Sequence, residues 1–183
     1  MESLKGKFLI ASPKLVDRNF FRSVILMVQH NEQGAIGLVL NRPLEMTVKS
    51  AWEQVSQSAC EIEQPLYQGG PCEGPLMLLH SEISTSENEV LDGVRFSTDR
   101  ETIQELVEAN RGMMRFFVGY SGWAAGQLES EMDVGGWLTA PATADLVFLS
   151  EPHVLWDALH RAISRAGYEG VNPKLIPEDP SMN

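Results

Sequence analysis

The chain alternates short apolar runs with polar turns that contain glycine, proline or asparagine, and most of the runs have the length of a strand. Such runs cover residues 7–11, 24–28, 35–40, 66–68, 76–80, 115–120, 137–140 and 146–149. Residues 24–28 are apolar at every position, which is typical of a strand buried on both faces. The polar segment that follows predicts a hairpin loop, with residues 35–40 as the return strand, where Gly37 permits a bulge or a close approach.

Helical periodicity marks four further segments. They are residues 47–56, 98–109, 123–132 and 152–166. The second opens on the capping-box sequence Thr98-Asp99-Arg100-Glu101, and the last begins at Pro152 and stops at Gly167. Because hairpins and helices both connect the strands, the order favours an α+β fold with a mixed sheet over a regular βαβ repeat.

Composition limits the organisation and the compartment. With 183 residues, 43% of them hydrophobic, the chain predicts one globular domain over residues 1–167 and a loosely ordered tail over residues 168–183. The two cysteines, Cys60 and Cys72, make no disulfide framework, and no apolar run is long enough to span a membrane. These features predict a cytoplasmic protein with reduced thiols, no membrane association and no cofactor.

Charge argues against one class of partner. The net charge of −11 repels nucleic acid, and direct DNA binding needs a basic surface that releases counterions. The first 22 residues are the exception, because basic residues outnumber acidic ones there. They predict either a small anion-binding surface or a solvated edge.

One candidate site lies at the end of the predicted hairpin away from its loop. There, Asn41 would lie near Ser23, so that five residues could cluster: Asp17, Arg18, Ser23, Asn41 and Arg42. Arginine with asparagine and serine suits a carboxylate or phosphate ligand. The alternative is structural, with Asn41 and Arg42 ending the strand and Arg42 pairing with Asp17.

A second candidate follows the apolar run at residues 115–120. If residues 123–132 are helical, Trp123, Gln127 and Glu131 share one face and form a platform beside the Gly122 turn, where free amide N–H groups favour an anion. Arg115 and Tyr120, on the preceding strand, complete this group. The alternative is that Trp123 packs in the core and the carboxylates are solvated or cap backbone.

Histidines give a third candidate group. His30 and His80 both end apolar runs, so each could be a general base or a ligand, or a structural histidine with satisfied nitrogens. His30 is about 17 Å from Asn41 along the hairpin, too far to share one small site. The spacing of the histidines and cysteines matches no metal-binding motif. The sequence around Ser121 resembles a nucleophile elbow but lacks the last glycine of that motif.

Five blocks in order over about 150 residues resemble the AlgH/YqgE family. They are the segments from Gly6 to Val24 and from His30 to Pro43, Gly69-Gly70-Pro71 with Leu79-His80, Gly93 with Ser97 and Asp99, the segment from Phe117 to Glu131 with Trp137, and Leu146 and Phe148 with Trp156. The resemblance implies a compact α+β fold whose bifurcated sheet curls into a pseudo-barrel with flanking helices. It also implies a bacterial cytoplasmic protein. Cys72 departs from the family pattern, where an aliphatic residue usually follows Gly-Gly-Pro.

Two functions remain open from the sequence. The family name implies a regulator of transcription, and the lack of a complete catalytic set favours a protein that acts through a protein partner or a small anionic ligand. The alternative is an enzyme or a nucleotide-binding or phosphometabolite-binding protein, with its site at the Gly122 helix start and the Asn41/Arg42 strand end. Convergence of Arg42, Arg115, Gln127 and Glu131 on one pocket would favour the alternative. The sequence determines neither the oligomeric state nor the reactivity of the cysteines.

Overall fold

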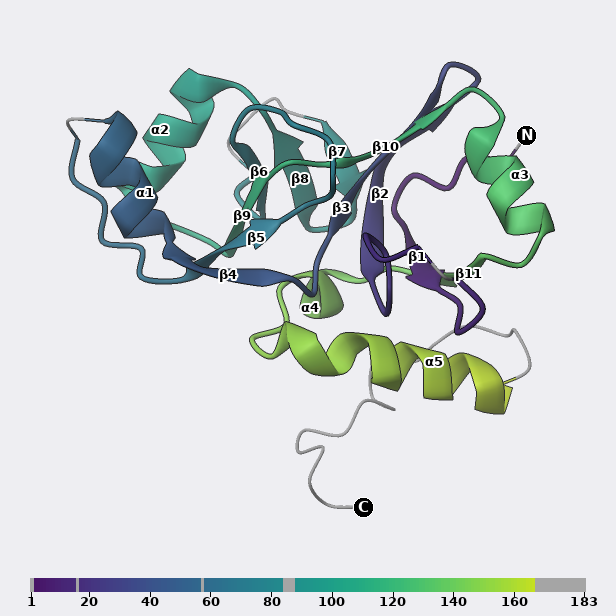
Figure 1. Ribbon diagram of the computed structural model, residues 1–183. Coiled ribbons are helices and arrows are strands. Elements are labelled where there is room, and N and C mark those ends of the chain that lie inside the picture. The colour runs from purple at the N-terminus through teal and green to yellow at the C-terminus, as the bar shows by residue number, and fades with distance from the viewer. Residues whose placement is uncertain (1, 16, 57, 84–87, 167–183) are drawn as a thin grey trace, which may run out of the picture.

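The computed structural model describes residues 2–15, 17–56, 58–83 and 88–166, which form two sheets flanked by helices (Figure 1). The strands are β1 (Lys7–Ala11), β2 (Val24–Asn31), β3 (Gly34–Val39), β4 (Pro43–Thr47), β5 (Pro65–Gln68), β6 (Met77–His80), β7 (Glu89–Leu91), β8 (Val94–Ser97), β9 (Met114–Val118), β10 (Ser121–Ala124) and β11 (Trp137–Pro141). The helices are α1 (Val48–Val55), α2 (Arg100–Ala109), α3 (Gln127–Asp133), α4 (Ala144–Val147), the 3-10 turn η1 (Pro152–Val154) and α5 (Leu155–Ala166).

The first sheet has five antiparallel strands in the order β10-β3-β2-β1-β11. The predicted hairpin is its centre, formed by β2 and β3. Its register shifts between Met27 and Gln29, and Gly37 lies opposite Met27. A Cβ at Gly37 would lie 2.4 Å from Cγ2 of Ile25, so the expected bulge and close approach both occur here.

The second sheet has six strands in the order β4-β5-β9-β6-β8-β7. In the described part of this sheet β5 and β9 pair in parallel, with Tyr67 opposite Phe117, and the other pairs are antiparallel, so the sheet is mixed, as predicted. Among the described strands the two sheets remain separate and no closed barrel forms, so the α+β class is confirmed while the pseudo-barrel is not seen as a closed structure.

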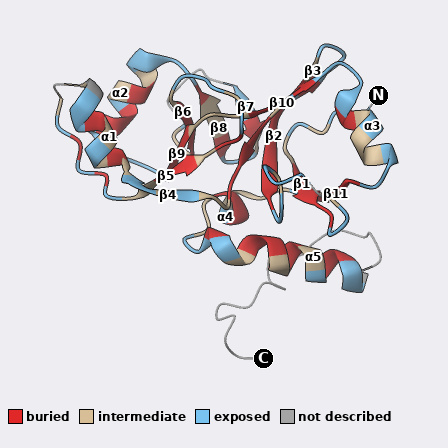
Figure 2. Cartoon of the chain, in the orientation of Figure 1, coloured by how far each residue is buried: buried red, intermediate tan, exposed pale blue. Residues whose placement is uncertain are grey.

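Helices cover the outer faces of this arrangement (Figure 2). The amphipathic helices α1 and α2 pack on the second sheet, where Trp52, Ile103 and Leu106 join Leu78 and Phe116 in one apolar cluster. The largest cluster lies between the sheets and α5, and a smaller one lies beneath α3. Burial of these faces supplies the main driving force for folding.

Two predicted elements are wrong. Residues 121–124 form strand β10, so residues 123–124 do not begin the predicted helix; the strand pairs with β3 from Ser121 opposite Gly37 to Ala124 opposite Gly34. Gly126, with a φ of 74°, then turns the chain so that α3 begins only at Gln127. Residues 146–149 are not a strand, since α4 covers the buried pair Leu146 and Val147; a short apolar run cannot distinguish a buried strand from a buried helix turn.

The caps and ends add detail to the sequence expectations. Helix α2 is capped by Asp99, whose carboxylate accepts from the backbone N–H of Thr102, one position later than the capping box places the cap. Helix α5 follows the turn at Pro152 as expected, whereas Gly167 and the predicted tail lie outside the described residues. No helix in the described part of the chain has the length and apolar character needed to cross a membrane.

Candidate functional site

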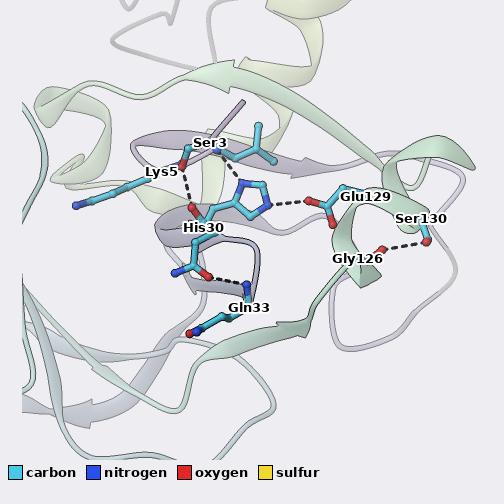
Figure 3. Close-up of polar contacts among 9 residues, drawn as sticks. Ser3, Lys5, His30, Gln33, Gly126, Glu129 and Ser130 are labelled. Atoms are coloured by element: carbon cyan, nitrogen blue, oxygen red, sulfur yellow. Dashed lines mark hydrogen bonds and ion pairs between the residues drawn. The ribbon is translucent and has the colours of Figure 1, made fainter. Parts of the chain in front are cut away.

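His30 is held from both sides by its neighbours (Figure 3). The backbone N–H of Leu4 donates to Nδ1 over 2.9 Å, and Nε2 lies 2.9 Å from a carboxylate oxygen of Glu129 on α3. Because a backbone N–H can only donate, Nδ1 is the acceptor, and the N–H at Nε2 donates to the carboxylate of Glu129. The imidazole therefore joins the N-terminal segment to α3, with no nitrogen left to act as a base.

The pairing with His30 has a measurable pH dependence. Hydrogen bonds from its own backbone N–H and from His30 lower the pKa of Glu129 below its ordinary value. A lowered carboxyl pKa stabilises the fold above the ordinary value and loses that contribution as pH falls through the lowered one. We expect Glu129→Gln to flatten the decrease in unfolding free energy below about pH 4.5, measured by urea titration. Equal acid dependence in the variant and the parent would contradict the assignment.

Part of the predicted strand-end cluster forms, because Asn41 and Arg42 bind the backbone of the segment before β2. Asn41 accepts from the N–H of Val24 over 2.9 Å and donates to the carbonyl of Arg22 over 2.8 Å, so the predicted approach to Ser23 is confirmed. Arg42 donates to the carbonyl of Phe21 over 3.1 Å. These three bonds fix the conformation of the segment.

The other members of this cluster have local or exposed positions. Ser23 is fully buried and donates to the carbonyl of Phe20, while Asp17 accepts from the N–H of Asn19. Arg18 is exposed. Burial lowers the pKa of Arg42, and the negative charge of Asp17 opposes this shift.

Trp123, Gln127 and Glu131 also come together, although Trp123 lies on β10 and only the other two lie on α3. One carboxylate oxygen of Glu131 accepts from the indole N–H of Trp123 over 3.0 Å and from that of Trp137 over 2.8 Å. Its other oxygen accepts from Gln127, whose amide oxygen accepts from the N–H of Ala124. Trp123 and Trp137 are buried and meet edge to face, so the set closes a small aromatic core.

Arg115 lies in the interior of the second sheet. Its guanidinium donates to the carbonyls of Leu40 and Leu149 and lies 4.5 Å above the ring of Tyr67. Burial lowers the pKa of Arg115, and interaction with Tyr67 opposes the shift. Tyr120 exchanges two backbone hydrogen bonds with Cys72 at an isolated bridge.

The remaining candidates are buried in separate sheets. His80 on β6 has no exposed surface and lies opposite Arg95 and Met114 in the second sheet, whereas His30 belongs to the first. Ser121 is also fully buried and donates to the carbonyl of Gly69 over 3.1 Å. Among the described residues, no group of three histidine, cysteine or acidic side chains is arranged to hold a metal ion.

The predicted site residues therefore occupy separate places. Arg42 binds the segment before β2, Arg115 lies within the second sheet, and Gln127 and Glu131 lie on α3. Gln127 and Glu131 share one hydrogen-bond set, whereas Arg42 and Arg115 each have a separate one, so the four residues do not form one pocket. Ligand binding by any of these residues stays a prediction. Their positions do not support a single shared site.

A pocket of about 270 Å³ lies instead between α1 and α2, where sequence reasoning placed no site. Its described lining comes from both helices, the segment before β6 and the segment before α2: Trp52, Ser56, Pro75, Leu76, Thr98, Arg100, Ile103 and Gln104. The sequence signal was the helical spacing of Trp52 and Ile103, which is also the pattern of ordinary core residues. Only the placement of the two helices reveals the hollow.

Residues 8–167 match the model of the AlgH-like family. The chain belongs to the AlgH-like family. A UPF0301 protein of Chlorobium limicola is 38% identical over 184 residues, covering 97% of this chain and 95% of the relative. A UPF0301 protein of Myxococcus xanthus is 36% identical over the whole length of both chains.

Two solved structures agree with the fold described above. The solution structure of AlgH from Pseudomonas aeruginosa superposes with a TM-score of 0.74 at 32% identity, covering 99% of this chain and 96% of that one. A crystal structure of a Corynebacterium diphtheriae protein gives a TM-score of 0.69 at 26% identity, covering 88% and 87%. The resemblance found in the sequence is thus confirmed.

Proposed function

We propose that this AlgH-like protein is a regulatory protein that acts through a protein partner or a small ligand, without catalysing a reaction and without binding DNA directly. The proposal rests on the hydrogen bonds that the candidate catalytic groups already make. Both nitrogens of His30 are engaged, and the Ser121 hydroxyl is buried against a backbone carbonyl. A nucleophilic hydroxyl needs a general base within hydrogen-bond reach. In these positions His30 cannot serve as that base for Ser121.

The pocket between α1 and α2 supports the same conclusion. None of its described lining residues is a carboxylate, an imidazole or a thiol, the groups that most often transfer protons or attack substrates. It offers apolar surface with a few polar groups, which is the usual composition of a ligand site. Binding without turnover is the activity this lining suits.

Charge supports the part of the proposal that concerns DNA. The net charge of −11 disfavours contact with the phosphate backbone, and basic residues near the N-terminus are partly neutralised by neighbours. Arg22 pairs with Asp157, and Lys7 pairs with Glu2 over 2.8 Å. Any effect on transcription would then pass through another molecule.

The segment before β2 offers a surface for a protein partner. Phe21 at its tip is 64% exposed, yet the backbone around it is fixed by Asn41, Arg42 and Ser23. Arg22 holds a left-handed conformation with a φ of 54°, which is costly for a residue with a side chain. A rigid loop that presents an exposed aromatic ring is typical of an interface anchor.

The stability of two variants checks this division of roles. We expect Phe21→Ser to change the unfolding free energy by less than about 0.5 kcal/mol, because the ring is mostly in solvent. Asn41→Ala should lower it by about 1–3 kcal/mol, since two backbone groups lose their partner. Urea unfolding measures both. If Phe21→Ser were as destabilising as Asn41→Ala, Phe21 would serve the fold and the interface would lose its support.

A ligand screen tests the proposed function itself. Nucleotides, phosphorylated metabolites and small carboxylates would be added to the purified protein, and each ligand that raises the melting temperature would be incubated with it and recovered. We expect the ligand to be recovered unchanged. Its conversion into a product by the protein would contradict the proposal and favour the enzyme alternative.

A further inference from the structure

The pocket between α1 and α2 has an apolar floor. Trp52 and Ile103 are 6% and 3% exposed, so their side chains are fixed in the cluster beneath the helices while they also face the hollow. Leu76 and Pro75 extend the apolar wall from the segment before β6. A ligand that fills this space gains by removing apolar surface from water.

Most polar groups around the pocket already have partners. The indole N–H of Trp52 donates to the Ser58 hydroxyl, which also bonds Ser56 over 3.0 Å. The Gln104 amide donates to Glu108 over 2.9 Å. These bonds leave little capacity to recognise a strongly polar ligand such as a sugar or a free base.

Arg100 differs from these groups. It is exposed, it is the one cation among the described lining residues, and within the described chain it forms no ion pair. The adjacent carboxylate of Asp99 accepts from the N–H and the hydroxyl of Thr102, both over 2.9 Å, so it is engaged with the start of α2. Arg100 therefore offers unpaired positive charge at the edge of an apolar hollow, in a protein whose net charge is −11.

We propose that the pocket between α1 and α2 binds a small amphipathic anion, with an apolar body against Trp52, Leu76 and Ile103 and one carboxylate or comparable group at Arg100. This inference rests on the proposed function and deepens it, because it gives the class of small ligand to which the protein responds. A guanidinium binds a carboxylate through paired hydrogen bonds, which makes the anion the orienting group. The apolar floor then selects the body of the ligand by size.

The test uses 4-phenylbutyrate as the probe and 4-phenylbutan-1-ol as its uncharged match. Both are titrated into the full chain, and binding is followed by the NMR signal of the Trp52 indole N–H, assigned by its loss in Trp52→Phe. Two variants accompany the parent: Arg100→Gln at the pocket, and Arg111→Gln just beyond the other end of α2 as the control for removing an exposed arginine. Both replaced side chains are exposed, so both variants should fold.

We expect 4-phenylbutyrate to shift the Trp52 signal and Arg100→Gln to weaken its binding about tenfold or more, the size of one charge-assisted contact. The alcohol should bind the parent and Arg100→Gln equally, and Arg111→Gln should match the parent. An unchanged Trp52 signal at millimolar probe, or equal affinity of Arg100→Gln and the parent for the anion, would overturn the site. Conversion of screened ligands would overturn the proposed function instead, so the two failures are distinguishable.

Discussion

Glu131→Ala is expected to lower the free energy of unfolding by about 2–4 kcal/mol, although Glu131 was a candidate for ligand binding. The indole N–H groups of Trp123 and Trp137 both donate to one oxygen of Glu131. Both rings are buried, so removing the carboxylate leaves two donors without their acceptor. The melting temperature should fall by about 5–12 °C, measured by calorimetry.

Two further variants separate this effect from a general effect on α3. Asp133→Ala changes an exposed carboxylate on the same helix and should leave stability within about 0.5 kcal/mol. Glu131→Gln keeps an oxygen acceptor and should cost less than Glu131→Ala. A loss below about 0.5 kcal/mol in Glu131→Ala would mean that the carboxylate is not needed for the aromatic core and is available for another role.

Arg115→Ala is expected to lower the free energy of unfolding by about 3–4 kcal/mol. The guanidinium donates to two backbone carbonyls and stacks on Tyr67, and the residue is only 4% exposed. The variant loses these contacts and leaves a hollow within the second sheet. Burying the guanidinium charge costs free energy, as the lowered pKa of Arg115 indicates. The loss of stability in the variant is therefore smaller than the sum of the lost contacts.

Arg115→Met separates the cost of the hollow from the cost of the lost charge and hydrogen bonds. Methionine keeps much of the buried volume without charge or donors, so it should cost less than alanine, and the difference measures the hollow. Arg111→Met removes an exposed arginine and serves as the control. Urea unfolding compares the set. A stability of Arg115→Ala close to that of the parent would show that Arg115 is retained for a purpose other than the fold.

The sequence predicted most of the fold because local pattern and tertiary structure agree over most elements. The run at residues 24–28 is apolar throughout and becomes the central strand β2, in which residues 24–28 are all buried. The helix prediction failed at residues 123–124, where tryptophan and alanine fit a helix as well as a strand. Pairing with β3 decides that segment, and such pairing is not visible in local spacing.

The candidate site was predicted less well, for a related reason. Spacing correctly brought Asn41 toward Ser23 and Gln127 toward Glu131, but residue type alone does not show what a polar group contacts. The groups proved to bind backbone and indole N–H groups. The pocket was missed because Trp52 and Ile103 look like core residues in sequence, and because nothing local to Arg100 indicates that a hollow lies beside it.

The predicted polar clusters hold the fold together, and we propose that ligand binding takes place at the pocket between α1 and α2. The most direct measurement is the rise in melting temperature that 4-phenylbutyrate causes in the parent, Glu131→Gln, Arg42→Gln and Arg100→Gln. Each protein is compared with its own ligand-free value. A ligand at a hundred times its dissociation constant adds about 2.7 kcal/mol. We predict that the rise persists in Glu131→Gln and Arg42→Gln and is reduced in Arg100→Gln. A rise lost in the first two and kept in Arg100→Gln would contradict the claim.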